Sequence, residues 1–351
     1  MKKLRVFKGA VFCIIFTMVI AGCSTNNTKS LHSEASPGQT TQTQNTLEEN
    51  TIVKGNLFHG FYNPKIDGKG KMLPLQYNGG ELTLDYSVRA SGDAKNVGFL
   101  IFVDGKPQPY KLNKTAASYQ YMHTIQVKED DQDTPFTFLF TPIIGKSGDN
   151  LHISIVSMYN PSFLPDMKET TSYGGYQTTL ETGTELIFNQ DTEMLDIAAL
   201  SQQEGLSNVH QSTEPVTEDL LKKHSVMEKV DVEALEKRVF SDLSVNGETK
   251  QDNFKVDKSG KLKITFKLFG HPEVRYRNTF YINHKALASE EVSSFETVLS
   301  KGNAVVVDAE IELDKLEDFN TFYVVSVPVN ANDFPDDVII VQKTPSLLLY
   351  K

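Results

Sequence analysis

The pattern of apolar and polar positions changes several times along the chain, and most of it is typical of short strands. From about Gly55 onward, apolar or alternating runs are separated by Gly, Asn, Asp and Pro residues. Residues 82–88 alternate with period two, and residues 97–103 form a continuous apolar run that stops at Asp104-Gly105, a strong hairpin-turn signal. Strands of this length and spacing predict an antiparallel β-sandwich.

Two parts of this region resemble each other in the same order along the chain, which indicates a duplication. We therefore expect a mainly β protein with two tandem Ig-like β-sandwich domains, at residues 54–190 and 241–351. Ig-like describes the architecture here, because the chain has no Trp and neither half has a Cys pair. The matching segments are Asp67-Gly68 with Asn246-Gly247, 80–86 with 260–266, 102–106 with 281–285, and Val156-Ser157 with Val325-Ser326.

Between the two expected sandwiches, the apolar spacing becomes that of helices. One helix is predicted over residues 216–224 with Thr213 as its cap, and a second over residues 231–243. Residues 194–200 are a third, shorter candidate. We therefore predict a helical linker over residues 191–240, and the alternative of a loosely packed spacer stays open.

The start of the chain has the three parts of a secretory signal. Basic residues precede an apolar run of about a dozen residues, which is shorter than the roughly 20 that a membrane span needs. The run ends in Ile20-Ala21-Gly22-Cys23, which resembles the lipobox of bacterial lipoproteins. That resemblance implies a diacylglyceryl group on the Cys23 thiol, cleavage in front of it, and anchoring in a Gram-positive-like cell membrane on its extracytoplasmic face.

The expected N-terminal region is thus a lipoprotein signal peptide at residues 1–22 and a tether at residues 23–53. The tether is rich in Ser, Thr, Asn and Gln, and it has too few large apolar residues to bury a core, so we expect it to be disordered. Cys13 would leave with the signal and Cys23 would carry lipid. The mature chain would then offer no thiol nucleophile and no cysteine-based zinc site.

The net charge of −10 argues against a nucleic-acid partner, because phosphate contacts need clustered Lys and Arg. The acidic run at residues 129–133 lacks the Gly and the distal Glu of an EF-hand, so we expect no metal there. None of the eight His residues has a metal-binding spacing. We expect His123 and His152 to be partly buried structural residues and His284 to be a solvated turn residue.

Tyrosines on a loop that Gly residues make flexible are the best candidates for ligand binding. Tyr173 and Tyr176 flank a Gly pair, and Tyr119 and Tyr121 could join the same surface. Exposed tyrosines on such loops are typical of recognition surfaces. The alternative, in which the tyrosines cap the core of a sandwich, stays open.

No nucleophile elbow, zinc-protease motif, phosphate loop or dinucleotide fingerprint occurs in the sequence, and we expect no cofactor. The sequence favours a membrane-anchored surface lipoprotein that acts as a non-enzymatic binding or scaffolding module in the cell envelope. An envelope protein or a wall glycan is the expected partner, besides the lipid bilayer that Cys23 would enter. The alternative is an envelope hydrolase of glycan or peptide whose carboxylates meet only in the folded chain.

Overall fold

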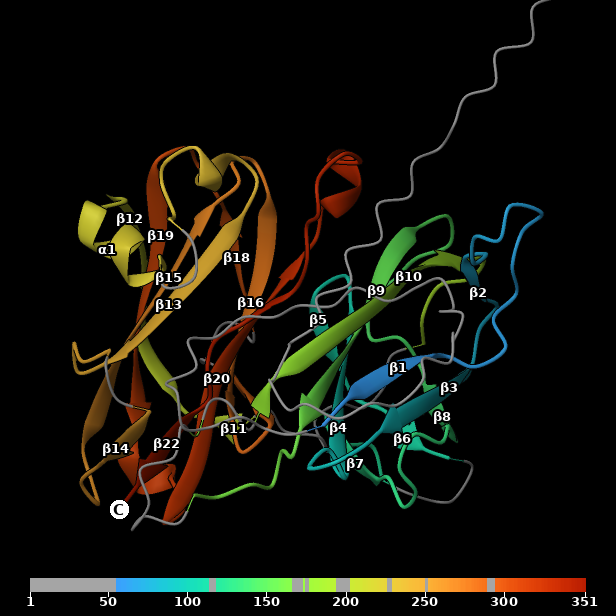
Figure 1. Ribbon diagram of the computed structural model, residues 1–351, viewed down its shortest axis with the longest axis horizontal. Coiled ribbons are helices and arrows are strands. Elements are labelled where there is room, and N and C mark those ends of the chain that lie inside the picture. Colours follow the sequence, from blue (N-terminus) through green and yellow to red (C-terminus); the bar gives the residue numbers. More distant parts are fainter. Residues whose placement is uncertain are drawn as a thin grey trace, which may run out of the picture. The chain divides into compact units, whose positions relative to one another are not determined.

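The computed structural model describes residues 55–113, 118–165, 173, 177–193, 203–225, 229–249, 252–288 and 294–351. The expected signal peptide, the tether and the Cys23 lipidation site lie outside these residues, as do Tyr176 and the helix candidate at 194–200. Within the described part, strands dominate (Figure 1). No helix in that part is both long and apolar enough to cross a membrane.

The first sandwich consists of two sheets with an Ig-like strand order. Their facing sides enclose an aromatic core in which Tyr86, Phe99 and Phe138 pack edge to face or tilted. One sheet contains, in order, β1 (Leu57–Phe61), β3 (Leu82–Ala90), β8 (Thr134–Phe140) and β6 (Lys111–Leu112). The other contains β2 (Leu75–Tyr77), β10 (Thr179–Phe188), β9 (Asn150–Tyr159), β4 (Asn96–Val103) and β5 (Lys106–Gln108), with β7 (His123–Gln126) paired to β4.

The second sandwich repeats this plan around its own core. One sheet contains, in order, β12 (Leu206–Pro215), β19 (Asn303–Glu312), β15 (Lys261–Gly270) and β13 (Val239–Val245). The other contains β11 (Gln203–Glu204), β17 (Lys285–Ala288), β16 (Arg275–Ile282), β20 (Phe319–Pro328), β22 (Leu347–Tyr350) and β14 (Asn253–Lys255), with β18 (Phe295–Val298) on β16 and β21 (Gln342–Lys343) on β20.

The two sandwiches match strand by strand, which confirms the predicted pair of tandem Ig-like folds. In the first, β4 pairs with β9, β9 with β10, and β10 runs parallel to β2. In the second, β16, β20, β22 and β14 pair in the same way, including the parallel pair. The turns that end β4 and β16 also match, because both central residues have positive φ in Asp104-Gly105 and in Asn283-His284.

The predicted helical linker over residues 191–240 is wrong for much of its length. Residues 206–215 form the edge strand β12, because the open edge of β19 supplies partners for its backbone groups. The first predicted helix shortens to α1 (Glu218–Lys223), whose cap is Thr217 rather than Thr213. Of the second, only a single 3-10 turn at Ala234–Glu236 is helical, and the later residues enter β13.

Four strands are buried on both faces, unlike the half-buried strands beside them. β3 alternates between buried and exposed positions, whereas every residue of β4 after Asn96 is buried. Nearly all of β20 is buried as well, and β9 and β16 are buried along most of their length. One face of each belongs to the core of its own sandwich, so the other face must be covered by something else.

Candidate functional site

The outer faces of these four strands pack against each other and form what we call the junction of the two sandwiches. On β4, Phe99 and Ile101 point into the core of the first sandwich, and the intervening Leu100 and Phe102 point into the junction. The junction is a continuous apolar cluster with buried members from both sandwiches. These members are Leu100, Phe102, Val156 and Met158 from the first, and Tyr281, Ala286, Tyr323, Val325, Val327 and Val341 from the second.

Equivalent residues of the two repeats meet in the junction. In the alignment of the repeats, Phe102 corresponds to Tyr281, and Val156 corresponds to Val325; all four lie in the apolar cluster. A surface that packs against its own copy is the arrangement of a two-fold symmetric dimer interface. Because the two sandwiches share one strand order, the chain contains, within one molecule, the kind of contact that the two subunits of a symmetric dimer make.

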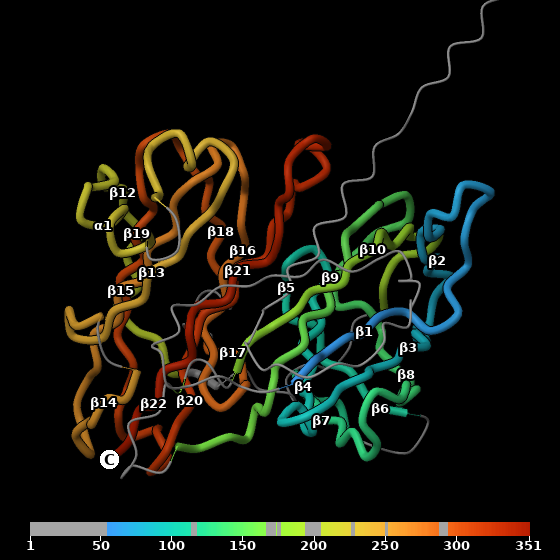
Figure 2. The backbone as a smooth tube through the Cα atoms, viewed as in Figure 1, coloured from blue at the N-terminus to red at the C-terminus, as the bar shows by residue number. Residues whose placement is uncertain are grey.

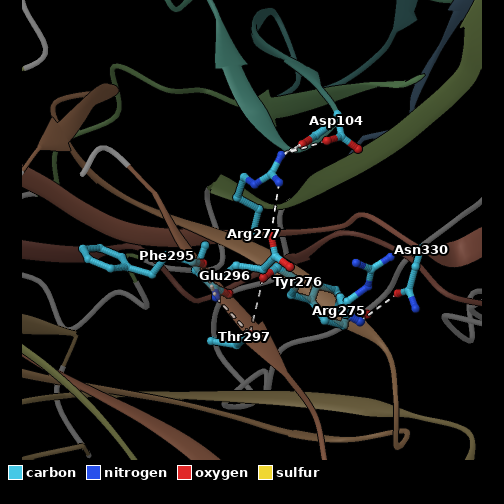
Figure 3. A network of polar contacts seen from close by, with 9 residues as sticks. Asp104, Arg275, Tyr276, Arg277, Phe295, Glu296, Thr297 and Asn330 are labelled. Atoms are coloured by element: carbon cyan, nitrogen blue, oxygen red, sulfur yellow. Dashed lines mark hydrogen bonds and ion pairs between the residues drawn. The ribbon is translucent and has the colours of Figure 1, made fainter. Parts of the chain in front are cut away.

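Arg277 on β16 makes the main ionic contact across the junction (Figure 3). Its Nη1 donates to a carboxylate oxygen of Asp104 at 3.0 Å and also to the Asp104 carbonyl oxygen. Its Nη2 donates to Glu296 on β18 at 3.1 Å. The side chains of Arg277 and Asp104 are only 15% and 26% exposed, so the charge-assisted bonds between them are partly shielded from water and fix the β4–β5 turn against the second sandwich.

Gly105 allows this turn to approach so closely. Its φ is +72°, a left-handed conformation that favours glycine. A Cβ atom at this position would lie 2.9 Å from Cβ of Arg277 and 3.1 Å from a methyl group of Val329. The turn therefore needs a glycine both for its backbone conformation and for its packing.

His284 makes the corresponding contact from the other hairpin, so the expectation of a solvated turn residue is wrong. Its Nε2 lies 2.7 Å from the carbonyl oxygen of Pro161, and its Nδ1 lies 3.1 Å from the Tyr323 hydroxyl. Because a carbonyl only accepts, Nε2 carries the proton and the hydroxyl donates to Nδ1. Burial lowers the pKa of His284 to about 4, so the ring is neutral at pH 7.

Two further ionisable side chains are partly buried at the junction. The carboxylate of Glu181 accepts the backbone N–H of Val341 at 2.8 Å, and burial raises the pKa of Glu181. Burial also lowers the pKa of Lys343 to about 7. The Lys343 ammonium donates to the Thr344 carbonyl at 3.0 Å and lies 4.7 Å from the centre of the Tyr323 ring. These polar bonds reduce the desolvation cost of both groups.

Of the predicted tyrosines, the three that the structure describes, Tyr119, Tyr121 and Tyr173, do not form one exposed surface. Tyr173 is fully buried, its backbone N–H donates to Asp252 at 2.6 Å, and its hydroxyl bonds to Thr321 of the second sandwich. Tyr121 is also buried. Tyr119 is partly exposed, and its hydroxyl donates to Glu81 at 3.2 Å. The predicted role of Tyr173 as an exposed ligand contact is therefore wrong, because its side chain is fully buried and its hydroxyl bonds to the second sandwich.

The remaining candidates make hydrogen bonds and ion pairs within the first sandwich. His123 is half-buried and bonds to the Tyr110 carbonyl at 2.9 Å. Burial lowers the pKa values of His123 and of His152. In the acidic run, Asp130 pairs with Lys95, and Asp133 accepts from Arg89 at 2.9 Å. No group of three or more His, Cys, Asp or Glu side chains in the described residues could hold a metal ion.

No protein-family model matches the chain, and no curated protein matches it. Among solved structures, it is similar to Dpr2 Ig1-Ig2 in complex with DIP-Theta Ig1-Ig3, at 9% identity and a TM-score of 0.20, over 85% of this chain and 65% of that one. It is also similar to the fibronectin(III)-like modules of Clostridium thermocellum CbhA, at 9% identity and a TM-score of 0.19, over 84% and 93%. A marsupial T cell receptor gives 11% identity and a TM-score of 0.18, over 84% and 100%.

The packing of Gly105 predicts a specific loss of stability for Gly105→Ala. A left-handed alanine costs about 1–2 kcal/mol, and overpacking against Arg277 and Val329 adds about 1–3 kcal/mol. Gly302→Ala is the matched control, because Gly302 has a φ of +70° and a Cβ atom added there would meet no other atom within 4 Å. Chemical unfolding should show that Gly105→Ala loses the larger free energy; equal losses in the two variants would contradict the close packing.

The lowered pKa of His284 predicts that the free energy of unfolding depends on pH in the mildly acidic range. Between about pH 6.5 and pH 4, the unfolded chain binds a proton at this imidazole and the folded chain does not, so acid destabilises the fold. His284→Asn removes this proton uptake and suits the left-handed backbone. The slope of unfolding free energy against pH should fall by up to about 1.4 kcal/mol per pH unit.

The matched control for this measurement is His210→Asn, which changes an exposed side chain on β12. We expect the control to retain the full pH dependence. His59 continues to contribute in both variants, because burial lowers its pKa to about 4 as well. Identical slopes for the two variants would show that the His284 ring is not neutral in the folded chain.

Proposed function

We propose that this protein is a membrane-anchored surface lipoprotein that acts as a non-enzymatic binding or scaffolding module in the cell envelope. The observation that carries the proposal is the junction, in which an apolar cluster and the Arg277–Asp104 contact join two Ig-like sandwiches. Such a joint favours one fixed spacing between the ends of the sandwiches. A module that holds a partner at a defined place needs this property.

The junction also restricts which surfaces of the protein are free to bind a partner. The outer faces of β4, β9, β16 and β20 are used inside the molecule. The candidate surfaces are therefore the sheets that contain β3 and β15, together with the loops at the ends of the sandwiches. An envelope protein or a wall glycan is the proposed partner, and loops on a rigid scaffold are where such recognition is commonly placed.

The lipobox-like sequence supports the anchor, and Cys23→Ser tests it. In a Gram-positive host that is fed a clickable fatty acid, we expect the full chain to carry the label and to fractionate with membranes. Removing the thiol removes the acceptor of the diacylglyceryl group, so the variant should lose the label completely. Cys13→Ser is the control, because that thiol precedes the proposed cleavage point and the mature chain would be unchanged. A label that persists in Cys23→Ser would contradict the anchor.

Binding and hydrolysis are separated by incubating the full chain with labelled wall glycan and with surface-exposed envelope proteins. A binding module should retain its partner in a fixed ratio and leave it intact, whereas a hydrolase should release fragments with turnover. Arg277→Ala should weaken retention several-fold by loosening the junction. Arg89→Ala removes an exposed ion pair within the first sandwich and should retain the partner. Catalytic release of fragments would replace the proposal with the hydrolase.

A further inference from the structure

The connection between β1 and β2 folds into a small hairpin over residues 62–73, which we call the 62–73 hairpin. Figure 2 shows it in blue, as a loop that extends away from the strands it joins. Its backbone pairs Ile66 with Met72, and the N–H of Leu73 donates to the Lys65 carbonyl at 2.8 Å. The hairpin therefore has a defined shape.

Exposed apolar side chains concentrate in and beside this hairpin. The described residues contain nine large apolar side chains that are exposed, and four of them lie between positions 58 and 73. Ile66 is 60% exposed, and Tyr62 and Leu73 are each 43% exposed. Apolar groups gathered in this way on a polar surface mark a site that is covered by another molecule or by a membrane.

The charge of the hairpin is opposite to that of the whole chain. Lys65, Lys69 and Lys71 are exposed, and none of them forms a salt bridge among the residues that the structure describes. The single acid is Asp67, whose carboxylate accepts the backbone N–H groups of Lys69 at 2.7 Å and Lys71 at 2.9 Å. The hairpin thus carries a net positive charge in a chain whose net charge is −10.

We propose that the 62–73 hairpin lies in the headgroup region of an anionic lipid bilayer. Ile66 and Leu73 would leave water, Tyr62 would sit at the interface, and the lysine ammonium groups would contact lipid phosphates while their stems follow the apolar surface. Each lysine near such a surface contributes about 1 kcal/mol of attraction, a factor of about five in affinity. A dissolved polyanion would attract the lysines but leave Ile66 in water, so the apolar residues favour the bilayer.

This inference rests on the proposed anchor for the identity of the bilayer. β1 begins at Leu57, so the hairpin belongs to the first strands after the segment that leads from Cys23. A lipid at Cys23 would hold the same membrane within reach of the hairpin, and the hairpin would then orient the first sandwich against it. Two membrane contacts on one chain reinforce each other, because the second one forms at a high effective concentration.

The absence of Trp from the chain allows a direct test. Ile66→Trp in the full chain introduces a single indole into the hairpin, at the most exposed of its large apolar positions. With vesicles of phosphatidylglycerol and phosphatidylcholine in about equal amounts, we expect its emission to shift to shorter wavelength. Brominated lipid in the same vesicles should quench most of the emission. Val338→Trp, at a position that is 71% exposed in the second sandwich, is the matched control and should show neither effect.

Charge reversal tests the electrostatic part of the proposal. Lys65→Glu/Lys69→Glu/Lys71→Glu, combined with Ile66→Trp, should abolish the shift and the quenching. Lys255→Glu/Lys258→Glu/Lys263→Glu makes the same charge change at exposed positions of the second sandwich and should preserve both effects. If the protein binds the vesicles but the indole stays in water, the inference is overturned. Quenching that persists after the three hairpin lysines are changed to glutamate would also overturn it.

The proposed lipid anchor and the proposed membrane contact of the hairpin are tested by separate measurements, so either one can be wrong without the other. Mass spectrometry of the N-terminal peptide reports lipid on Cys23 and is independent of the indole signal. If Cys23 is unmodified and the full chain added to vesicles still shows the shift and the quenching, the hairpin inference stands and the proposed anchor is wrong. If Cys23 is lipidated and the indole stays in water, the anchor stands and the hairpin inference is overturned.

Discussion

The structure depends on one constraint, which is that one sheet of each sandwich has two apolar faces and must bury both. Along β4, the side chains of Phe99 and Leu100 point in opposite directions, and both are almost completely buried. The first sandwich can cover only the inner face of this sheet. The outer face is covered by the equivalent sheet of the second repeat, so neither sheet reaches its buried state unless the two sandwiches pack together.

Polar groups at the junction give this apolar contact a defined geometry. Apolar clusters alone tolerate sliding, whereas Arg277 must meet Asp104, and His284 must meet the Pro161 carbonyl. Burying such groups is expensive unless their hydrogen bonds are made. The polar contacts therefore favour the single arrangement in which they are satisfied, which is why the function proposed for the chain relies on a fixed body.

The junction and the 62–73 hairpin use apolar residues in different ways. In the junction, they pack on each other within the chain; in the hairpin, Ile66 and its neighbours remain exposed. The first group explains how the two sandwiches are joined, and the second points to a surface outside the protein. Together with a lipid at Cys23, the hairpin would determine which part of the first sandwich faces the membrane.

The sequence by itself determined the strand-rich architecture, the two repeats and the turns at Asp104-Gly105 and Asn283-His284, because these follow from local alternation and turn chemistry. The continuous apolar run at residues 97–103 also carried the signal for a sheet buried on both faces, although not what covers it. Only the tertiary structure decided that β12 is a strand, that Tyr173 is buried and that His284 is partly buried. The reason is physical: the open edge of β19, and the surface of the opposite sandwich that covers Tyr173 or His284, are provided by residues far away along the chain.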